Sequence, residues 1–222
     1  MWLEGGNIMV ATGDSVVDSR DTAKKRFDDW SRSYEQSFTW RHFFSPVHDI
    51  VQAHVLGVQG THILDVGCGT GDMLRRFAGE DAERLVGFDE SEGMLAKAKE
   101  LSEGLDNITY LPGSAESLPF DDASFDIVTS CVAFHHFPDS KGTVAEMYRV
   151  LKPGGRLFIC DLTQEGLLGK IFLAYGKHKA DDHYFTEATM KALLMEAGFR
   201  EVASERVLPF PPVMLVFGFK ER

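Results

Sequence analysis

The chain has 222 residues, a length that suits one packed domain with a short addition rather than several domains. Hydrophobic residues make up 44% of it and charged residues 26%, ordinary values for globular proteins that argue against disorder or membrane insertion of the bulk. The net charge of −11 works against attraction to phosphates. We therefore expect a globular protein that binds no nucleic acid and has no stable insertion in a membrane.

The cysteines and the start of the chain indicate a compartment. Cys68, Cys131 and Cys160 lie far apart, without the paired spacing of zinc or dithiol sites, so we expect reduced thiols and a cytoplasmic protein. The first residues include acidic side chains and glycines, where a signal peptide would have a basic and then an apolar stretch. We expect a monomer or a homodimer.

The N-terminal part divides in two. Residues 1–20 show no sustained periodicity and are predicted to be a disordered tail. Residues 21–58 show a helical pattern rich in aromatic side chains, with a second helix expected over Pro46–Leu56. Two interpretations of the aromatic residues stay open, namely packing between helices or a lid over a cofactor and a substrate. The candidate lid residues are Tyr34, Phe38 and Trp40.

Residues 59–222 are predicted to form the main domain, because short strand-like runs alternate with helical stretches as in βαβ units. The expected strands are 62–66, 84–89, 108–111, 125–130, 156–161, 200–207 and 213–219. The expected helices are 72–78, 92–102, 141–151 and 187–197. The short link around Pro209–Pro212 permits a hairpin but no parallel crossover, so the last strand should be antiparallel.

A glycine-rich loop follows the first expected strand. Residues 62–72 read H-I-L-D-V-G-C-G-T-G-D, which places Gly67, Gly69 and Gly71 between a strand and a helix. Glycines let the backbone turn sharply and approach a ligand closely, because no Cβ intervenes. The loop is typical of a nucleotide-type ligand at the carboxyl edge of a sheet, although short glycine motifs also occur in merely tight turns.

Asp89 ends the second expected strand, about twenty residues after the loop. At this spacing a carboxylate reaches the two hydroxyls of a ribose. The alternative is a helix N-cap, since a helix is expected to begin shortly after it. The combination with the glycine loop favours the ribose interpretation.

The details of the loop indicate which ligand it holds. A dinucleotide site usually reads G-x-G-x-x-G and places a pyrophosphate at the helix N-terminus. Here the third glycine comes one position early, and Asp72 in the first helical turn would repel a pyrophosphate. S-adenosylmethionine (SAM) has no phosphate, and its sulfonium and ammonium groups suit the nearby carboxylates of Asp65 and Asp72.

With these residues the chain resembles the class I SAM-dependent methyltransferases, in particular the ubiquinone/menaquinone-biosynthesis-like, "type 11" small-molecule branch. The resemblance covers roughly residues 27–219 and rests on ordered blocks. They are L-D-V-G-C-G-T-G (64–71), V-G-F-D-E-S-E-G-M-L-A-K-A (86–98), G-S-A-E-S-L-P-F (113–120), F-D-I-V-T-S-C-V-A-F-H-H-F (125–137) and V-L-K-P-G-G-R-L (150–157).

The resemblance implies an α/β fold with a Rossmann-like seven-stranded sheet in the order 3-2-1-4-5-7-6, strand 7 antiparallel, helices on both faces and an N-terminal helical lid. It implies SAM as cofactor and S-adenosylhomocysteine (SAH) as product, with Asp89 on the ribose and Met94 against the adenine. The family often has Asp at the position of Ser114, so the hydrogen bond to the adenine amine is expected either to be weaker in this chain or to come from a backbone group. The expected cofactor residues are Asp65, Gly67, Cys68, Gly69, Gly71, Asp89, Glu90, Met94, Ser114, Ala115, Glu116, Ser130 and Cys131.

The implied activity is transfer of a methyl group from SAM to a small, apolar or aromatic acceptor. Two alternatives stay open: a SAM-binding protein without catalysis, acting as a sensor or partner subunit, and an NAD-dependent oxidoreductase, which would share the sheet and Asp89.

Two neighbouring histidines are the candidate catalytic residues. His135 and His136 follow the fourth expected strand, at the edge where open α/β folds bind ligands. One of them would take a proton from the acceptor, and His136 is the preferred candidate. In the alternative interpretation the two rings point apart, one packed and one solvated. No metal site is expected, because His42, His48 and His54 lack the i, i+4 spacing of helical zinc ligands.

Overall fold

The computed structural model describes residues 27–29, 31, 35, 44–56, 60–79, 82–167 and 182–222. The predicted tail and the candidate lid residues Tyr34, Phe38 and Trp40 lie outside these described residues. Within the described part of the chain, no helix is both long enough and apolar enough to cross a membrane.

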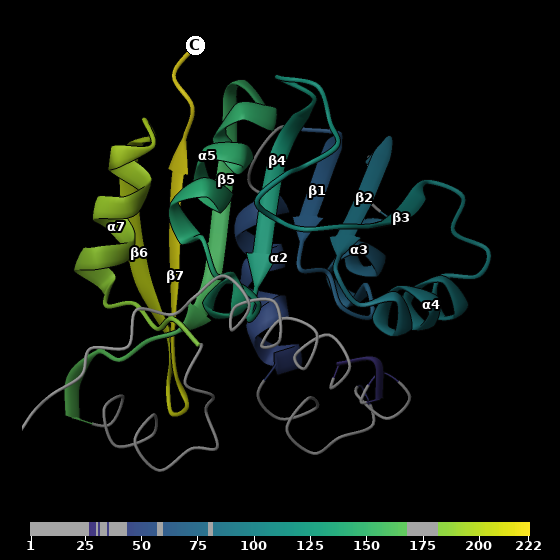
Figure 1. Ribbon diagram of the computed structural model, residues 1–222, viewed down its shortest axis with the longest axis horizontal. Helices are drawn as coiled ribbons and strands as arrows, with labels where there is room; N and C mark the ends of the chain where they lie inside the picture. The colour runs from purple at the N-terminus through teal and green to yellow at the C-terminus, as the bar shows by residue number, and fades with distance from the viewer. Residues whose placement is uncertain are drawn as a thin grey trace, which may run out of the picture.

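Seven strands form one sheet in the order β3-β2-β1-β4-β5-β7-β6. β1 to β5 pair in parallel, whereas β7 is antiparallel to both β5 and β6. Figure 1 shows the arrowheads of β1, β2 and β4 at one edge of the sheet and that of β7 at the other. The predicted order and the antiparallel seventh strand are confirmed. The strands are β1 (His62–Val66), β2 (Arg84–Asp89), β3 (Ile108–Pro112), β4 (Phe125–Cys131), β5 (Leu151–Leu162), β6 (Arg200–Pro209) and β7 (Pro212–Phe219).

Helices cover both faces of the sheet, as predicted. One buried cluster joins β-sheet residues to Val51, Leu74 and Leu95 of three helices on one face. A second buried cluster joins β-sheet residues to Met147 and Leu194 of two helices on the other face. The first group is α2 (Ser45–Leu56), α3 (Asp72–Phe77) and α4 (Glu92–Leu101), and the second is α5 (Ser140–Val150) and α7 (Glu187–Glu196). A 3-10 turn, η3 (Phe134–His136), follows β4.

Side-chain caps mark where α4, α5 and α7 begin. Ser91 caps α4 by accepting a hydrogen bond from the Met94 amide, and Asp139 caps α5 in the same way. Thr186 caps α7 and forms a reciprocal capping box with Thr189. Such caps satisfy amide groups that have no partner inside the helix. The predicted cap and bounds of the last helix are therefore confirmed to within a residue.

The junction between α5 and β5 differs from the sequence prediction. The helix was expected to reach residue 151 and the strand to begin at 156, but α5 ends at Val150 and β5 begins at Leu151. Leu151 is fully buried and pairs with Phe125, and an irregularity in the register follows before Ile127 pairs with Arg156. The chain becomes extended early because Leu151 fills a core position beside β4.

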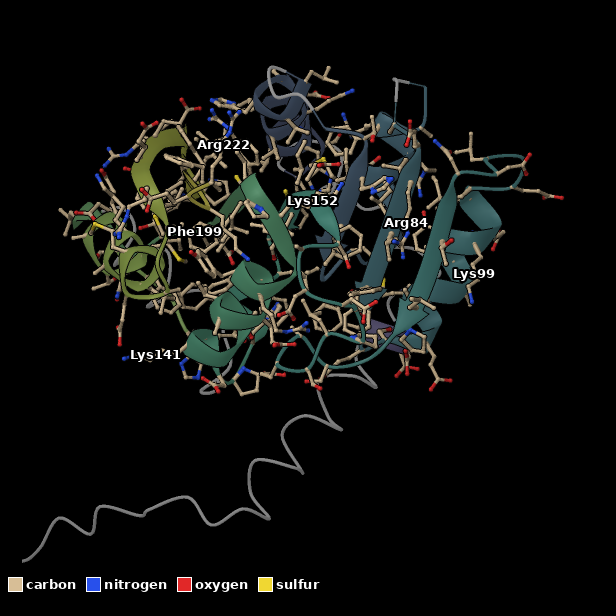
Figure 2. The ribbon with its side chains drawn as sticks, turned by 90° about the horizontal axis from the view of Figure 1, so that it is seen from above. Arg84, Lys99, Lys141, Lys152, Phe199 and Arg222 are labelled. Atoms are coloured by element: carbon tan, nitrogen blue, oxygen red, sulfur yellow. The ribbon has the colours of Figure 1, made fainter. Side chains whose placement is uncertain are left out.

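The amino ends of the strands are held together by an ion pair. The Lys152 ammonium lies 2.9 Å from Oδ1 of Asp126, whose Oδ2 accepts a hydrogen bond from the His62 amide at 3.0 Å. These contacts join the starts of β1, β4 and β5. Figure 2, seen from above, labels Lys152 and also Arg84, the first residue of β2. The candidate site residues Gly67, Asp89 and Ser130 lie at the opposite edge, where the parallel strands end.

Candidate cofactor and acceptor site

The glycine loop joins β1 to α3 at the carboxyl edge of the sheet. Gly67, Gly69 and Gly71 have φ values of 75°, 52° and 77°, in the left-handed region that favours glycine. A Cβ on Gly67 would lie 2.5 Å from Cβ of Ala133, and one on Gly71 would overlap the Tyr110 ring. A Cβ on Gly69 would meet nothing within 4 Å. The loop is therefore closely packed at its ends and open at its centre, where a ligand can approach the backbone.

Asp65 places a carboxylate inside the protein next to this loop. It is 2% exposed, and its Oδ1 accepts a hydrogen bond of 2.7 Å from Oγ1 of Thr129, its neighbour in the β1–β4 register. Burial raises the pKa of Asp65 to about 6. No ion pair to Asp65 is found among the described residues. A buried carboxylate without a paired cation fits a positively charged group of SAM.

Asp89 bridges the two loops that flank the cofactor position. Its Oδ2 accepts a hydrogen bond from the Gly69 amide and its Oδ1 one from the Ser91 amide, both at 2.9 Å. The N-cap of α4 is Ser91, so the alternative role of Asp89 as N-cap is wrong. A carboxylate offers about four acceptor positions, and two remain for the hydroxyls of a ribose.

Asp72 has a different environment from the one assumed in the sequence analysis. Its Oδ2 lies 2.7 Å from Nδ1 of His48 and 2.6 Å from Nε of Arg76. Burial raises the pKa of Asp72, but the hydrogen bonds and charges of these two partners lower it by more, so the net shift of the pKa is downward. Asp72 thus ties α2 to α3, and its charge is neutralised within the protein rather than presented to a ligand.

The residues expected around the adenine come from neighbouring segments. Met94 in α4 and Ala115 after β3 are buried, at 3% and 4% exposure. The Ser114 hydroxyl donates to the Glu116 carboxylate, so these two polar residues are paired with each other. Glu90, directly after Asp89, is exposed.

The end of β4 contributes an unsatisfied polar group. The Ser130 hydroxyl is fully buried and has no hydrogen-bond partner among the residues that the structure describes, which is unusual unless a ligand or water supplies one. Burial raises the thiol pKa of both Cys68 and Cys131 well above the usual value, which favours the protonated form of each. Together with the open Gly69 and the unpaired Asp65, the orphaned hydroxyl fits a bound SAM molecule.

Three described residues of the N-terminal part contact this edge. Oδ1 of Asp28 accepts hydrogen bonds from the Ser91 hydroxyl at 2.6 Å and the Gly93 amide at 2.8 Å. Oε1 of Glu35 accepts from the Thr70 hydroxyl and from Arg75, each at 2.6 Å. The Phe27 ring meets His136 edge-on, with centroids 5.2 Å apart. Figure 1 shows the short described N-terminal pieces, in purple, near the carboxyl ends of the strands.

The chain is similar to known methyltransferases along most of its length. Residues 64–159 match the family model of the methyltransferase domain. Over 199 residues the chain is 33% identical to the demethylmenaquinone methyltransferase of Staphylococcus epidermidis. The aligned region covers 77% of this chain and 78% of that protein. The chain belongs to the class I SAM-dependent methyltransferases of the ubiquinone/menaquinone type.

One further sequence relative agrees with this family, and one solved structure has the same fold. The chain is 32% identical over 190 residues to the ubiquinone/menaquinone biosynthesis C-methyltransferase UbiE of Pseudoalteromonas translucida, with 73% and 75% of the two chains covered. The Burkholderia thailandensis 1,6-didemethyltoxoflavin-N1-methyltransferase, solved with bound SAH, superimposes with a TM-score of 0.73 and 20% identity over 98% of this chain and 94% of that one. SAM is accordingly the cofactor of this methyltransferase, and the expected enzyme class is confirmed.

The two candidate catalytic histidines of the methyltransferase form a paired cluster. Nδ1 of His135 donates to Oδ1 of Asp161 at 2.6 Å, and Nδ1 of His136 donates to Oδ1 of Asp182 at 2.9 Å. The ring centroids of the histidines are only 3.8 Å apart, so the alternative interpretation, in which the two rings point apart, is wrong. Burial and the neighbouring His135 lower the pKa of His136 to about 4, which makes this imidazole neutral near pH 7.

The partners of the histidines were not found from the sequence. Asp161 is 26 residues and Asp182 46 residues from its histidine, and no short motif joins them. Tyr184, which stacks on His135 with centroids 5.0 Å apart, was missed for the same reason. One signal was present for Asp161, because it lies near the carboxyl end of β5, at the edge where β1 and β4 also end.

Proposed function

We propose that this methyltransferase acts on a small aromatic acceptor that carries a hydroxyl group, of the reduced-quinone type. The observation that carries the proposal is the histidine pair after β4. Since both Nδ1 atoms donate to carboxylates, Nε2 of His135 and of His136 keeps a lone pair that can accept a hydrogen bond from an acceptor hydroxyl. The rings of Phe27 and Tyr184 beside them suit a flat aromatic molecule.

The names of the relatives favour the same class of acceptor. The two similar sequences are named as methyltransferases of demethylmenaquinone and of ubiquinone/menaquinone biosynthesis. The small-molecule class of the acceptor follows from the family, whereas a quinone-like ring for this chain is our proposal.

Each group in the site has a role in orientation. SAM, when bound, supplies a methyl group already activated by the sulfonium. Asp65 would balance its positive charge, and Asp89 would accept from the ribose hydroxyls. His136, supported by Asp182, would hold the acceptor hydroxyl. Correct placement of two reactants can lower a barrier by about 7–11 kcal/mol, so orientation is the main contribution of the protein.

We also propose that residues 21–58 act as a lid on the domain of residues 59–222, with residues 1–20 as a tail. Support comes from Asp28, Glu35 and Phe27, which contact the start of α4, the glycine loop and His136 respectively. A covered site excludes water from the reacting groups.

We also propose that the protein is cytoplasmic and that its partner is a small-molecule acceptor. The three cysteines are free, which agrees with a reducing cytoplasm. The net charge of −11 supports a small-molecule acceptor rather than a nucleic acid.

Methyl transfer from labelled SAM tests the proposed acceptor. The full chain is incubated with [methyl-³H]SAM and one of three acceptors: a chemically reduced naphthoquinone that lacks its ring methyl, the same ring in the oxidised form, and an aromatic amine. Label is expected in the reduced ring only, and His136→Asn should lower this turnover by at least ~100-fold while SAH affinity is kept. Label in the amine alone would reject the proposed acceptor class, and equal turnover of the reduced ring by His136→Asn and the wild type would reject the proposed role of His136.

A further inference from the structure

His135, His136 and Asp182 form a cluster with the composition of a metal site. One ligand atom from each, a ring nitrogen or a carboxylate oxygen, lies within 4.8 Å of the others. The two histidines are consecutive in η3, and Asp182 is brought to them from the segment before α7. No other such cluster of three is found in the described part of the chain.

The hydrogen bonds of the two imidazoles leave their outer nitrogens ready to bind a cation. An ionised carboxylate can only accept a hydrogen bond, so the hydrogen in each pair sits on Nδ1 of the histidine. Each Nε2 therefore keeps its lone pair, and none of the described residues forms a hydrogen bond to Nε2 of either ring. A neutral imidazole whose other nitrogen donates to a carboxylate is the usual form of a metal-bound histidine.

The carboxylates are themselves held in place. Asp161 is 2% exposed and also accepts hydrogen bonds from the amides of His135 at 2.8 Å and Leu162 at 2.6 Å. Oδ2 of Asp182 accepts from the Tyr184 hydroxyl at 3.1 Å. Supporting groups of this kind orient metal ligands and raise their basicity. The imidazoles are thus oriented before any ion arrives.

We propose that His135 and His136 bind a divalent first-row transition-metal ion such as Zn²⁺ through their Nε2 atoms, while Asp161 and Asp182 hold the two rings through Nδ1. Imidazole ligands suit this class of ion. The two remaining positions of a tetrahedral ion would take water or an oxygen of the methyl acceptor, and that oxygen would then contact His136 through the ion instead of through a direct hydrogen bond. Ion binding by these groups does not depend on the proposed acceptor.

Metal titration of the full chain tests this site without SAM or an acceptor. Protein freed of metal by a chelator is titrated with Co²⁺, followed by visible absorption, and then with Zn²⁺ by calorimetry. We expect one ion per chain, and displacement of Co²⁺ by Zn²⁺. His136→Asn should weaken binding by at least ~100-fold, and Asp161→Asn, which acts through His135, by ~10- to 100-fold.

A matched histidine outside the cluster provides the control. His54 in α2 lies 3.3 Å from Glu205, so His54→Asn removes a partly exposed histidine–carboxylate pair and should leave binding unchanged. Circular dichroism and a thermal melt show whether each variant folds, and Asp182→Asn replaces His136→Asn if the latter does not. Absence of binding by the wild type, or equal binding by wild type and both cluster variants, would overturn the proposal.

Discussion

Asp65 keeps a negative charge where water cannot reach it, and this has opposite consequences for stability and for binding. Its pKa rises from 3.8 to about 6, roughly two units, because burial disfavours the charged form. Each unit corresponds to 1.36 kcal/mol, so ionised Asp65 destabilises the cofactor-free protein by up to about 3 kcal/mol near neutral pH. A cofactor with a positive charge would recover part of that free energy.

Asp65→Asn should therefore stabilise the protein and weaken cofactor binding. At pH 7.5 the free energy of unfolding should rise by about 1–3 kcal/mol, since the buried charge is gone, and SAH affinity should fall at least ~10-fold. Thermal melts and calorimetry measure the two quantities on the same samples.

The pH dependence gives a second check on Asp65. Because the folded pKa lies above the unfolded one, the stability that protonated Asp65 contributes is complete below about pH 4 and is lost as the pH rises through about 6. The stability difference between variant and wild type should thus be near zero at pH 4 and full above pH 7. A difference that does not change with pH would mean that Asp65 is not the titrating group.

Helix α4 offers a test of how the N-terminal part docks. Gly93 lies in its first turn, where a Cβ would come within 2.8 Å of the Asp28 Cα. Alanine suits a helix better than glycine by about 0.5–1 kcal/mol, so Gly93→Ala should leave α4 intact but push Asp28 away. We expect an unchanged melting temperature and at least a ~10-fold loss of turnover, measured with the labelled-SAM assay.

A matched glycine at the end of α3 controls for Gly93→Ala. A Cβ on Gly79 would meet no atom within 4 Å, so Gly79→Ala should keep full turnover. Equal turnover by both variants and the wild type would show that contact between Asp28 and α4 is not needed for catalysis.

The strands could be predicted from the sequence more fully than the site. Short apolar runs mark β1 and β2 with the observed bounds, and the short link before β7 requires a hairpin. The glycine loop and Asp89 follow from local spacing. In contrast, Leu151 belongs to β5 rather than to α5 because it pairs with Phe125 of β4. The helical periodicity of the sequence gives no information about this contact between distant segments.

Contacts between distant segments explain what the sequence did not reveal. The Asp28 side chain reaches the Gly93 amide across 65 positions, and His136 reaches Asp182 across 46. Asp72 looked like a ligand group beside the loop, yet its partner His48 lies on α2, 24 positions earlier. The sequence gives the chemical type of a polar side chain, but the hydrogen-bond partner of that side chain depends on which distant segments the fold brings together.

The molecule brings its candidate cofactor and acceptor residues together at one edge of the sheet. The glycine loop after β1, Asp89 of β2, Ser130 of β4 and the histidine turn all lie where parallel strands end, while the opposite edge is closed by Lys152 and its partners. The N-terminal part contacts this edge at three separate places, through Asp28, Glu35 and Phe27.

Two N-terminal deletions test the lid on the whole molecule. Removal of residues 1–20 should leave turnover nearly intact, because the contacts of Asp28 and Glu35 remain. Removal of residues 1–45 should abolish turnover, since these carboxylates and the aromatic segment are lost, while both buried clusters of the main domain stay complete. Circular dichroism and a thermal melt establish that the shortened chain is folded, and labelled SAM measures turnover.

A double variant of the full chain separates the contribution of the carboxylates from that of the aromatic residues. Asp28→Asn with Glu35→Gln removes the charges that accept hydrogen bonds from Gly93 and Thr70 but keeps the segment itself. Hydrogen bonds to a charged group contribute about 1.5–3 kcal/mol, so we expect turnover between that of the wild type and that of the longer deletion. Full turnover by the folded longer deletion would rule out the lid, because the main domain alone would then exclude water and place the acceptor.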